Sequence, residues 1–251
     1  MLLPRLIPCL DLRDGRVVKG VRFEGIRDVG DPVELAAAYA ESGADEIVLL
    51  DIAATRRGRG ATVEVVSRIR SEVDIPLTVG GGVNGVESAS ALFQAGADRV
   101  SVNSAALANP ALLDELAGLF GSQSVVVAID AARRGRGWVA LSRAGTIDTG
   151  VDAVDWAVQA VGLGAGEVLL TSHDRDGTGL GYDLELVRAV VDRTRVPVIA
   201  SGGARTAADL ESAFTSGATG ALLAGALHDG RLTIQELRRD LAGLGRELRP
   251  C

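Results

Sequence analysis

Two aspartates, Asp11 and Asp130, stand at the ends of apolar runs, a position where α/β proteins often place their chemistry. Asp11 ends the run 6–10, and Asp130 ends the run 125–129, 119 residues further along the chain. An apolar run followed by an acid and a turn is typical of the exit of a buried parallel strand, so both side chains are expected to face one opening. Two carboxylates that ionise independently can act there as general acid and general base. A single aspartate at such a position can also simply cap a turn.

Glycine-rich turns end two other apolar runs, again about half a chain apart. Backbone N–H groups of such turns can approach an anion closely, and the helix that follows adds its positive end. Each turn alone is equally well explained as a tight connection, but the pair predicts two phosphate sites and therefore a substrate with a phosphate at each end. The two predicted cradles are Gly81, Gly82, Asn103 and Ser104, and Gly202, Gly203, Ala224 and Gly225.

Four further residues are expected around the same opening, because they lie at strand ends or in the loops that follow them. Lys19 can close over a phosphate or an anionic intermediate. Thr171, Asp176 and Gly177 extend the polar ring. Long loops at 12–31, 52–61 and 131–150 follow strands and are expected to be lids, substrate clamps or solvated surface loops. In the third loop, Trp138–Leu141 is expected to form one arm of a hairpin.

The chain repeats itself once. Residues 46–51 resemble residues 167–172, and residues 95–98 resemble 216–219, both at a spacing of 121. Matched segments at a nearly constant spacing indicate two copies of one half-domain. Asp11 and Asp130 are therefore expected on symmetry-related strands, facing each other across the same opening.

Strand and helix signals alternate along the whole length. Eight strand–helix units in 251 residues, without a linker, predict a (β/α)8 TIM barrel made of two half-barrels and forming one domain over residues 1–251. A doubly wound open sheet is the alternative. Helix-start signals include Asp31–Pro32, Asn109–Pro110 and a capping box at 233–236. The predicted strands are 5–11, 46–51, 76–80, 98–103, 124–130, 167–172, 197–201 and 219–224, and the predicted helices are 32–43, 62–73, 85–95, 109–120, 152–163, 184–194, 206–216 and 233–243.

Composition narrows the class of protein. Apolar residues make up 47% of the chain and aromatic residues 3%, which suits a Val-, Leu- and Ile-built sheet covered by helices. A formal net charge of −7 argues against nucleic-acid binding. No apolar run is long enough to span a membrane and no signal peptide is recognisable, so a cytoplasmic protein is expected. Cys9 and Cys251 have no metal-type spacing, and neither a metal nor a cofactor is expected.

Charged residues begin four of the apolar runs, at the end opposite to the predicted site. They are Arg5, Glu46, Arg99 and Glu167. Charges that enter a barrel must be paired, and two of each sign can neutralise one another as a ring. The ring is either a structural plug or a gate to the interior.

Together these motifs resemble one family. Residues 7–11, 15–20, 78–82, 174–178 and 199–203 resemble the cyclase subunit of imidazole glycerol phosphate synthase, over essentially the whole chain. The resemblance implies an ammonia-dependent cyclase/lyase of histidine biosynthesis. Its substrate is a bis-phosphorylated ribulosyl-formimino aminoimidazole carboxamide ribonucleotide, and Asp11 and Asp130 match the acid–base pair. The family's glutaminase partner, in a heterodimer, would deliver ammonia through the gate that Arg5, Glu46, Arg99 and Glu167 match. Asp98 and Gln123 match positions around the partner interface.

The chain departs from the family pattern mainly in the predicted substrate mouth. Gly225 stands where a small hydroxyl residue is usual, Ala144 replaces a common Ser, and His173 a frequent apolar residue. His228–Asp229 replaces an aromatic-containing stretch, and Arg99 replaces the usual Lys. Two alternatives therefore stay open: a related bis-phosphate isomerase or specialised-metabolism enzyme, and a non-catalytic barrel that holds a glutaminase.

Overall fold

The computed structural model of the chain describes residues 3–21, 24–53 and 60–250. Eight parallel strands in this described part alternate with helices along the chain. The strands are β1 (Arg5–Arg13), β4 (Ile47–Asp51), β5 (Leu77–Gly80), β6 (Arg99–Val102), β7 (Val125–Arg134), β10 (Glu167–Ser172), β11 (Val198–Ser201) and β12 (Gly220–Leu223). The helices are α1 (Pro32–Glu41), α2 (Gly60–Glu72), α3 (Val86–Gln94), α5 (Ala111–Phe120), α6 (Ala153–Gly162), α7 (Leu184–Val191), α8 (Ala207–Thr215) and α10 (Ile234–Gly243).

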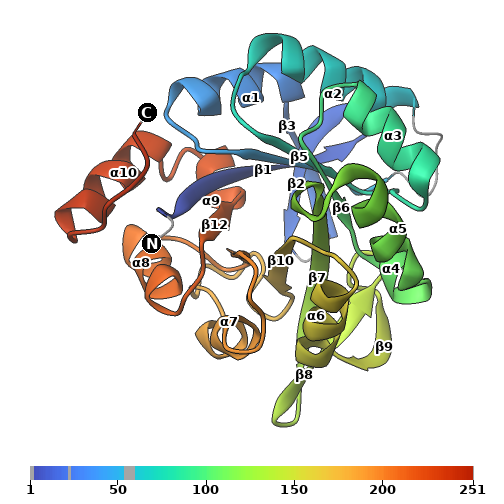
Figure 1. Cartoon of the computed structure of the whole chain (residues 1–251). Coiled ribbons are helices and arrows are strands. Elements are labelled where there is room, and N and C mark those ends of the chain that lie inside the picture. The colour runs from blue at the N-terminus through green and yellow to red at the C-terminus, as the bar shows by residue number, and fades with distance from the viewer. Residues whose placement is uncertain (1–2, 22–23, 54–59, 251) are drawn as a thin grey trace.

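The parallel strands close on themselves. Their order is β10-β11-β12-β1-β4-β5-β6-β7, and β7 pairs again with β10, from Glu167 opposite Val126 to Ser172 opposite Ala131. Figure 1 shows the helices arranged around the outside of these strands. The predicted (β/α)8 barrel is confirmed, and the open doubly wound sheet is wrong. We call the end where the strands finish the mouth and the end where they begin the floor.

Apolar side chains fill both faces of the strands. The outer faces pack against the helices, with Leu6, Leu10, Ile47 and Leu77 fully buried. Each such side chain stabilises the fold by roughly 1.5–3 kcal/mol through burial. A smaller cluster that includes Ile7 fills the space inside the barrel. No helix within the described ranges is both long and apolar enough to cross a membrane.

Two of the three predicted helix starts are confirmed. The Asp31 carboxylate accepts a hydrogen bond of 2.8 Å from the Val33 N–H, with Pro32 in the first turn, and Thr233 forms its capping box. The Asn109–Pro110 signal is wrong by one residue, because Pro110 itself occupies the N-cap and α5 begins at Ala111. The reason is a short helix, α4 (Ser104–Ala108), which precedes α5 and uses Asn109 as its C-cap.

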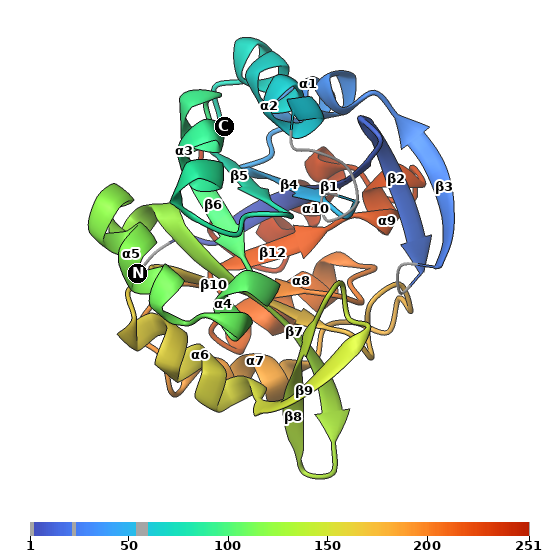
Figure 2. The same ribbon diagram turned by 90° about the vertical axis from the view of Figure 1, so that its right-hand side faces the viewer.

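Two antiparallel hairpins extend from the mouth, one in each half of the chain. After β1 the chain forms β2 (Arg16–Val21) and β3 (Glu24–Gly30), where the sequence predicts only a long loop. After β7 it forms β8 (Gly137–Ser142) and β9 (Ile147–Asp152), which confirms the hairpin arm predicted at 138–141. Figure 2 shows the two hairpins projecting at separate places. Of the predicted basic loop 52–61, residues 54–59 lie outside the described residues.

Candidate active site

A cavity opens at the mouth of the barrel, among the ends of the strands. It is lined by side chains from β1, β2, β4, β7 and β10, by the ends of β11 and β12, and by the loops that follow the last three of these strands. The predicted residues that line it are Asp11, Lys19, Asp130, Thr171, Asp176, Gly177, Gly202, Gly203, Ala224 and Gly225. Residues far apart in sequence thus form one site, as the half-barrel repeat predicts.

Asp11 lies on β1 beside the ammonium group of Lys19. The Lys19 Nζ is 3.7 Å from Asp11 Oδ2, and the Cys9 thiol donates a weak hydrogen bond of 3.6 Å to Asp11 Oδ1. Burial raises the pKa of Asp11, the positive charge of Lys19 lowers it, and the negative charge of Asp176 raises it again. The net pKa lies above the usual value for an aspartate. Lys19 therefore opposes the burial that favours the protonated form of Asp11.

Asp130 lies on β7 and has a neutral partner. The Asn103 amide donates a hydrogen bond of 2.9 Å to Asp130 Oδ2. Burial, followed by the negative charge of Asp176, raises the pKa of Asp130 to about 7, although the bond from Asn103 lowers it. A carboxyl group with such a pKa holds its proton in a substantial fraction of molecules at neutral pH, so it can donate that proton to a bound substrate.

The second predicted phosphate cradle forms part of the cavity wall. Gly202 has φ +92°, and a Cβ there would lie only 2.7 Å from the Ser172 carbonyl oxygen. Only glycine fits this close approach. Ala224 directly precedes a short helix, α9 (Gly225–His228), that the sequence did not predict. The loop and the start of this helix thus border the same cavity.

The first predicted phosphate cradle is built in the same way in the other half of the chain. Gly81 has φ +89°, and a Cβ there would lie 2.1 Å from the Asp51 carbonyl oxygen. Asn103 has φ −122° and ψ −88°, close to the values of −133° and −82° for Ala224, and each residue precedes a short helix. The backbone geometry of the two cradles is therefore related by the repeat.

The surroundings of the two cradles differ. Among the described residues, Gly81 and Gly82 line a smaller depression beside α2 and α3 rather than the main cavity. Asn103 is linked to the cavity through its bond to Asp130, and the Ser104 hydroxyl accepts a hydrogen bond of 2.8 Å from the Arg143 N–H. The β8–β9 turn therefore contacts the first cradle directly.

Two arginines at the opening of the cavity were not predicted from the sequence. Arg205, after Gly203, and Arg231, after α9, both line the cavity. The aliphatic part of Arg205 packs over Gly179, where an added Cβ would lie 3.3 Å from Arg205 Cδ. Neither arginine belongs to a recognisable motif; the only signal was the place of Arg205 two residues beyond a predicted phosphate loop.

The residues of the mouth that differ from the family pattern lie in two parts of it, at the β8–β9 turn and at α9. Ala144 has φ +55° in the β8–β9 turn, and His173 packs against Gly145 of the same turn. His228 accepts a hydrogen bond of 2.7 Å from the Tyr39 hydroxyl and donates one of 3.0 Å to the Cys9 carbonyl. Burial lowers the pKa of His228 to about 4, so this imidazole is neutral at physiological pH and ties α9 to α1 and β1.

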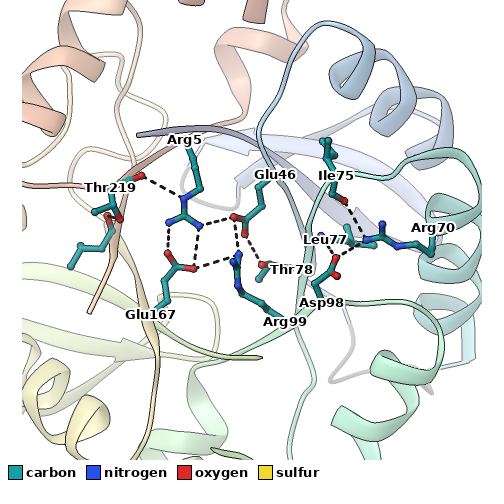
Figure 3. Close-up of polar contacts among 11 residues, drawn as sticks. Arg5, Glu46, Arg70, Ile75, Leu77, Thr78, Asp98, Arg99, Glu167 and Thr219 are labelled. Atoms are coloured by element: carbon teal, nitrogen blue, oxygen red, sulfur yellow. Dashed lines mark hydrogen bonds and ion pairs between the residues drawn. The ribbon is translucent and has the colours of Figure 1, made fainter. Parts of the chain in front are cut away.

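The four charges at the floor form one compact network, shown in Figure 3. Arg5 binds Glu46 at 2.7 Å and also Glu167. Arg99 lies 2.9 Å from Glu46 and 3.7 Å from Glu167. The Thr78 hydroxyl donates a hydrogen bond of 2.7 Å to Glu46. Burial lowers the pKa of Arg5, but its hydrogen bonds and charge interactions with the two glutamates outweigh this and raise it. The predicted ring of balanced charge is thus present.

Asp98 and Gln123 lie beside the floor, on the outside of the barrel, and both are exposed. Asp98 accepts hydrogen bonds of 2.8 Å from the Leu77 N–H and 2.7 Å from Arg70. The Gln123 amide donates one of 3.4 Å to the Phe120 carbonyl. Their exposure leaves both available to a docking protein.

The interior between floor and mouth is apolar. Its walls are the inward side chains Ile7, Cys9, Val48, Val126, Leu169, Ile199 and Leu222. Moving an ion into such surroundings would cost far more free energy of hydration than moving a small neutral molecule. The charged ring and the carboxylates Asp11 and Asp130 thus stand at opposite ends of one apolar column.

The sequence as a whole matches one protein family. Residues 5–233 fit the histidine biosynthesis protein family. The chain belongs to this family. Within it, the similar curated proteins are named imidazole glycerol phosphate synthase subunit HisF, and the match runs along the whole length. One from a Synechococcus strain is 54% identical, covering 100% of this chain and 97% of that protein.

The same name recurs among distant organisms. The relative from Metallosphaera sedula is 55% identical over 98% of both chains. The relative from Exiguobacterium sibiricum is 49% identical over 99% of this chain and 100% of its own. Each is described as a subunit, and thus as a part of a larger synthase.

Proposed function

We propose that the chain is the cyclase subunit of imidazole glycerol phosphate synthase. It would use ammonia to convert a bis-phosphorylated ribulosyl-formimino aminoimidazole carboxamide ribonucleotide into imidazole glycerol phosphate and an aminoimidazole carboxamide ribonucleotide. The observation that carries the proposal is the meeting of Asp11 and Asp130, from symmetry-related strands, in one cavity bordered by a glycine loop. The names of the full-length relatives support the same activity.

The two carboxylates would divide the proton transfers between them. Asp11 lies beside the Lys19 ammonium at 3.7 Å, which stabilises its ionised form, so Asp11 acts as the general base on the nitrogen that enters as ammonia. Asp130 has a pKa raised to about 7, so it acts as the general acid that protonates the departing group. Asp176 contributes negative charge near both.

The two cradles would bind the two phosphates of the substrate. The Gly202–Gly203 loop offers backbone N–H groups, and Arg205 and Arg231 at its edge supply positive charge, which compensates for the missing hydroxyl at Gly225. The Gly81–Gly82 loop with Asn103 and Ser104 is proposed for the other phosphate. If both cradles hold a phosphate, the central, reacting part of the molecule would be fixed near the carboxylates.

Ammonia would come from a glutaminase subunit docked on the floor in a heterodimer. Its route begins at the ring of Arg5, Glu46, Arg99 and Glu167 and follows the apolar interior to the mouth. Neutral ammonia can cross such an interior, whereas ammonium cannot without a large desolvation cost. Asp98 and Gln123, exposed beside the ring, are proposed partner contacts.

The experiment that tests the proposal is a direct assay. The purified chain is incubated with the ribulosyl substrate and an ammonium salt at alkaline pH, and both products are followed by absorbance and chromatography. Formation of both products supports the cyclase. Isomerisation of the related ribosyl compound, without cyclisation, would instead identify a bis-phosphate isomerase. Absence of any turnover of the folded protein would contradict an enzymatic role for the chain alone.

A further inference from the structure

Asp229, the residue that caps the C-terminal end of α9, connects two parts of the mouth. Its Oδ1 forms an ion pair with Arg27 on β3, and its Oδ2 forms one with Arg231 on the cavity wall. The Asp229 side chain is 24% exposed, against 54% for Arg27 and 58% for Arg231. One acid thus sits between two arginines, one of which belongs to the β2–β3 hairpin.

The hairpin carries Lys19 to the cavity. Lys19 on β2 stands directly opposite Arg27 on β3, so their side chains share one face of the antiparallel pair. Lys19 reaches Asp11 at 3.7 Å, and its Cε would lie 3.4 Å from a Cβ built on Gly225. The two ends of α9 therefore meet the hairpin at two points, Gly225 at Lys19 and Asp229 at Arg27.

Among the described residues, the strand ladder that joins the hairpin to β1 ends before Lys19. The β1–β2 ladder runs from Arg13 opposite Arg16 to Asp11 opposite Val18 and does not include Lys19. From Lys19 onward, β2 pairs only with β3 among the described residues. By contrast, α9 is fixed, because His228 bonds to the Cys9 carbonyl and to Tyr39. The ion pair thus joins a projecting hairpin to an anchored helix.

We propose that Asp229 is a positioning residue that latches the β2–β3 hairpin to α9 through Arg27 and so holds the Lys19 ammonium beside Asp11. Without the carboxylate, Arg27 and Arg231 would face each other as like charges, and the hairpin would lean away from α9. Such ion pairs are partly exposed and contribute little to global stability, so the effect is local. The consequence for turnover rests on the proposed function, whereas the latch itself does not.

The chain offers a direct probe of this latch, because Lys19 is its single lysine. An amine-acetylating reagent therefore modifies one lysine side chain, and peptide mass spectrometry gives its rate. Asp229→Asn should raise the acetylation rate of Lys19 by roughly threefold to tenfold, as expected for the loss of a partly exposed ion pair and its replacement by repulsion. Asp240→Asn is the matched control, because among the described residues Asp240 pairs with the neighbouring Arg239 on α10, far from the hairpin in sequence. It should leave the rate unchanged.

Two further readouts separate positioning from a structural role. Arg27→Glu should raise the rate in the same way, and combining it with Asp229→Arg should return the rate toward that of the parent. In the ammonia assay, Asp229→Asn should lower kcat/KM about as much as Lys19 labelling rises, with unchanged circular dichroism.

Unchanged labelling in folded Asp229→Asn would overturn the latch. Raised labelling with unchanged kcat/KM would overturn the positioning of Lys19 for catalysis. A parent protein without turnover would contradict the proposed function, and labelling alone would then decide on the latch.

Discussion

The mouth and the floor of the barrel are built on the same strands but balance their charges differently. At the floor, Arg5 and Arg99 neutralise Glu46 and Glu167 in direct ion pairs. At the mouth, Asp11, Asp130 and Asp176 line one cavity with Lys19, Arg205 and Arg231, but Lys19 lies 3.7 Å from Asp11, and Asp130 has the neutral Asn103 amide as its hydrogen-bond partner. Burial and the mutual repulsion of these carboxylates raise the pKa of Asp11 and Asp130. Carboxylates in direct ion pairs with arginine are suited to holding or gating, whereas carboxyl groups with a raised pKa are suited to moving protons.

The largest expected effect is at the mouth. Asp11→Asn and Asp130→Asn should each lower kcat about 10²–10⁴-fold, because each removes one positioned acid–base group while keeping its shape. Steady-state kinetics with ammonium as the nitrogen source checks this, with circular dichroism as the folding control. Activity close to that of the parent in either folded variant would remove these carboxylates from the mechanism.

A hydroxyl at Gly225 should improve substrate binding without changing the chemistry. Among the described residues, a Cβ at this position has only Lys19 Cε nearby, at 3.4 Å, so serine fits. One hydrogen bond to a phosphate is worth roughly 1.5–3 kcal/mol, so Gly225→Ser should lower KM about tenfold at constant kcat. Gly162→Ser, where a Cβ meets no described atom within 4 Å, is the control. A raised KM in Gly225→Ser would favour a different ligand for this mouth.

At the floor, Arg99→Ala should affect turnover with the two nitrogen sources differently. If the ring is a gate facing a partner, glutamine-dependent turnover in the complex should fall roughly fivefold or more relative to ammonia-dependent turnover. Arg239→Ala, on the exposed face of α10, should leave the ratio unchanged. Equal loss of both activities in Arg99→Ala would make the ring purely structural.

The smallest expected effect concerns the pH profile. The Asn103 amide lowers the pKa of Asp130 through its 2.9 Å hydrogen bond. In Asn103→Ala this pKa should rise, so the acid stays protonated to higher pH and the alkaline limb of kcat should move upward by up to about one pH unit. The pH dependence of kcat at saturating substrate measures this. A downward shift would contradict the role of Asp130 as the acid.

The barrel fold and the positions of Asp11 and Asp130 at strand ends could be predicted from patterns in the sequence. Apolar runs bounded by glycine, the spacing of 121 residues and the caps at Asp31 and Thr233 place the eight strands and the helices that follow them. The sites in the two halves could be matched because each strand end repeats. Each of these signals can be recognised in the sequence without knowing which segments meet in the fold, and the fold preserves them.

Features that depend on contacts between distant segments were not predictable. The β2–β3 hairpin was expected only as a loop, because its pairing depends on register with β1. The helices α4 and α9 are too short to show a period. Arg205 and Asp229 carry no motif, and only the closed barrel brings them to the cavity and the hairpin.

The environment of Asp130 also has a consequence for the resistance of the fold to heat and alkali. Its pKa rises from 3.8 in the unfolded chain to about 7 in the folded one, so the folded state binds the proton more tightly between these values. The free energy of unfolding therefore decreases as pH rises through this window. Below pH 3.8 the group is protonated in both states, and this loss is absent.

The Asp130→Asn variant, which we expect to be inactive, should then be more stable than its parent in alkaline solution. An amide keeps the shape of the carboxyl group and can accept the Asn103 hydrogen bond, but it carries no charge to bury. We expect the gain to be about 1–3 kcal/mol at pH 8, or several degrees in Tm, and about half of that or less at pH 5. Thermal unfolding at the two pH values measures it. If Asp130 is the acid of the proposed reaction, the carboxyl group that donates the proton is also the one that lowers the stability of the fold at alkaline pH.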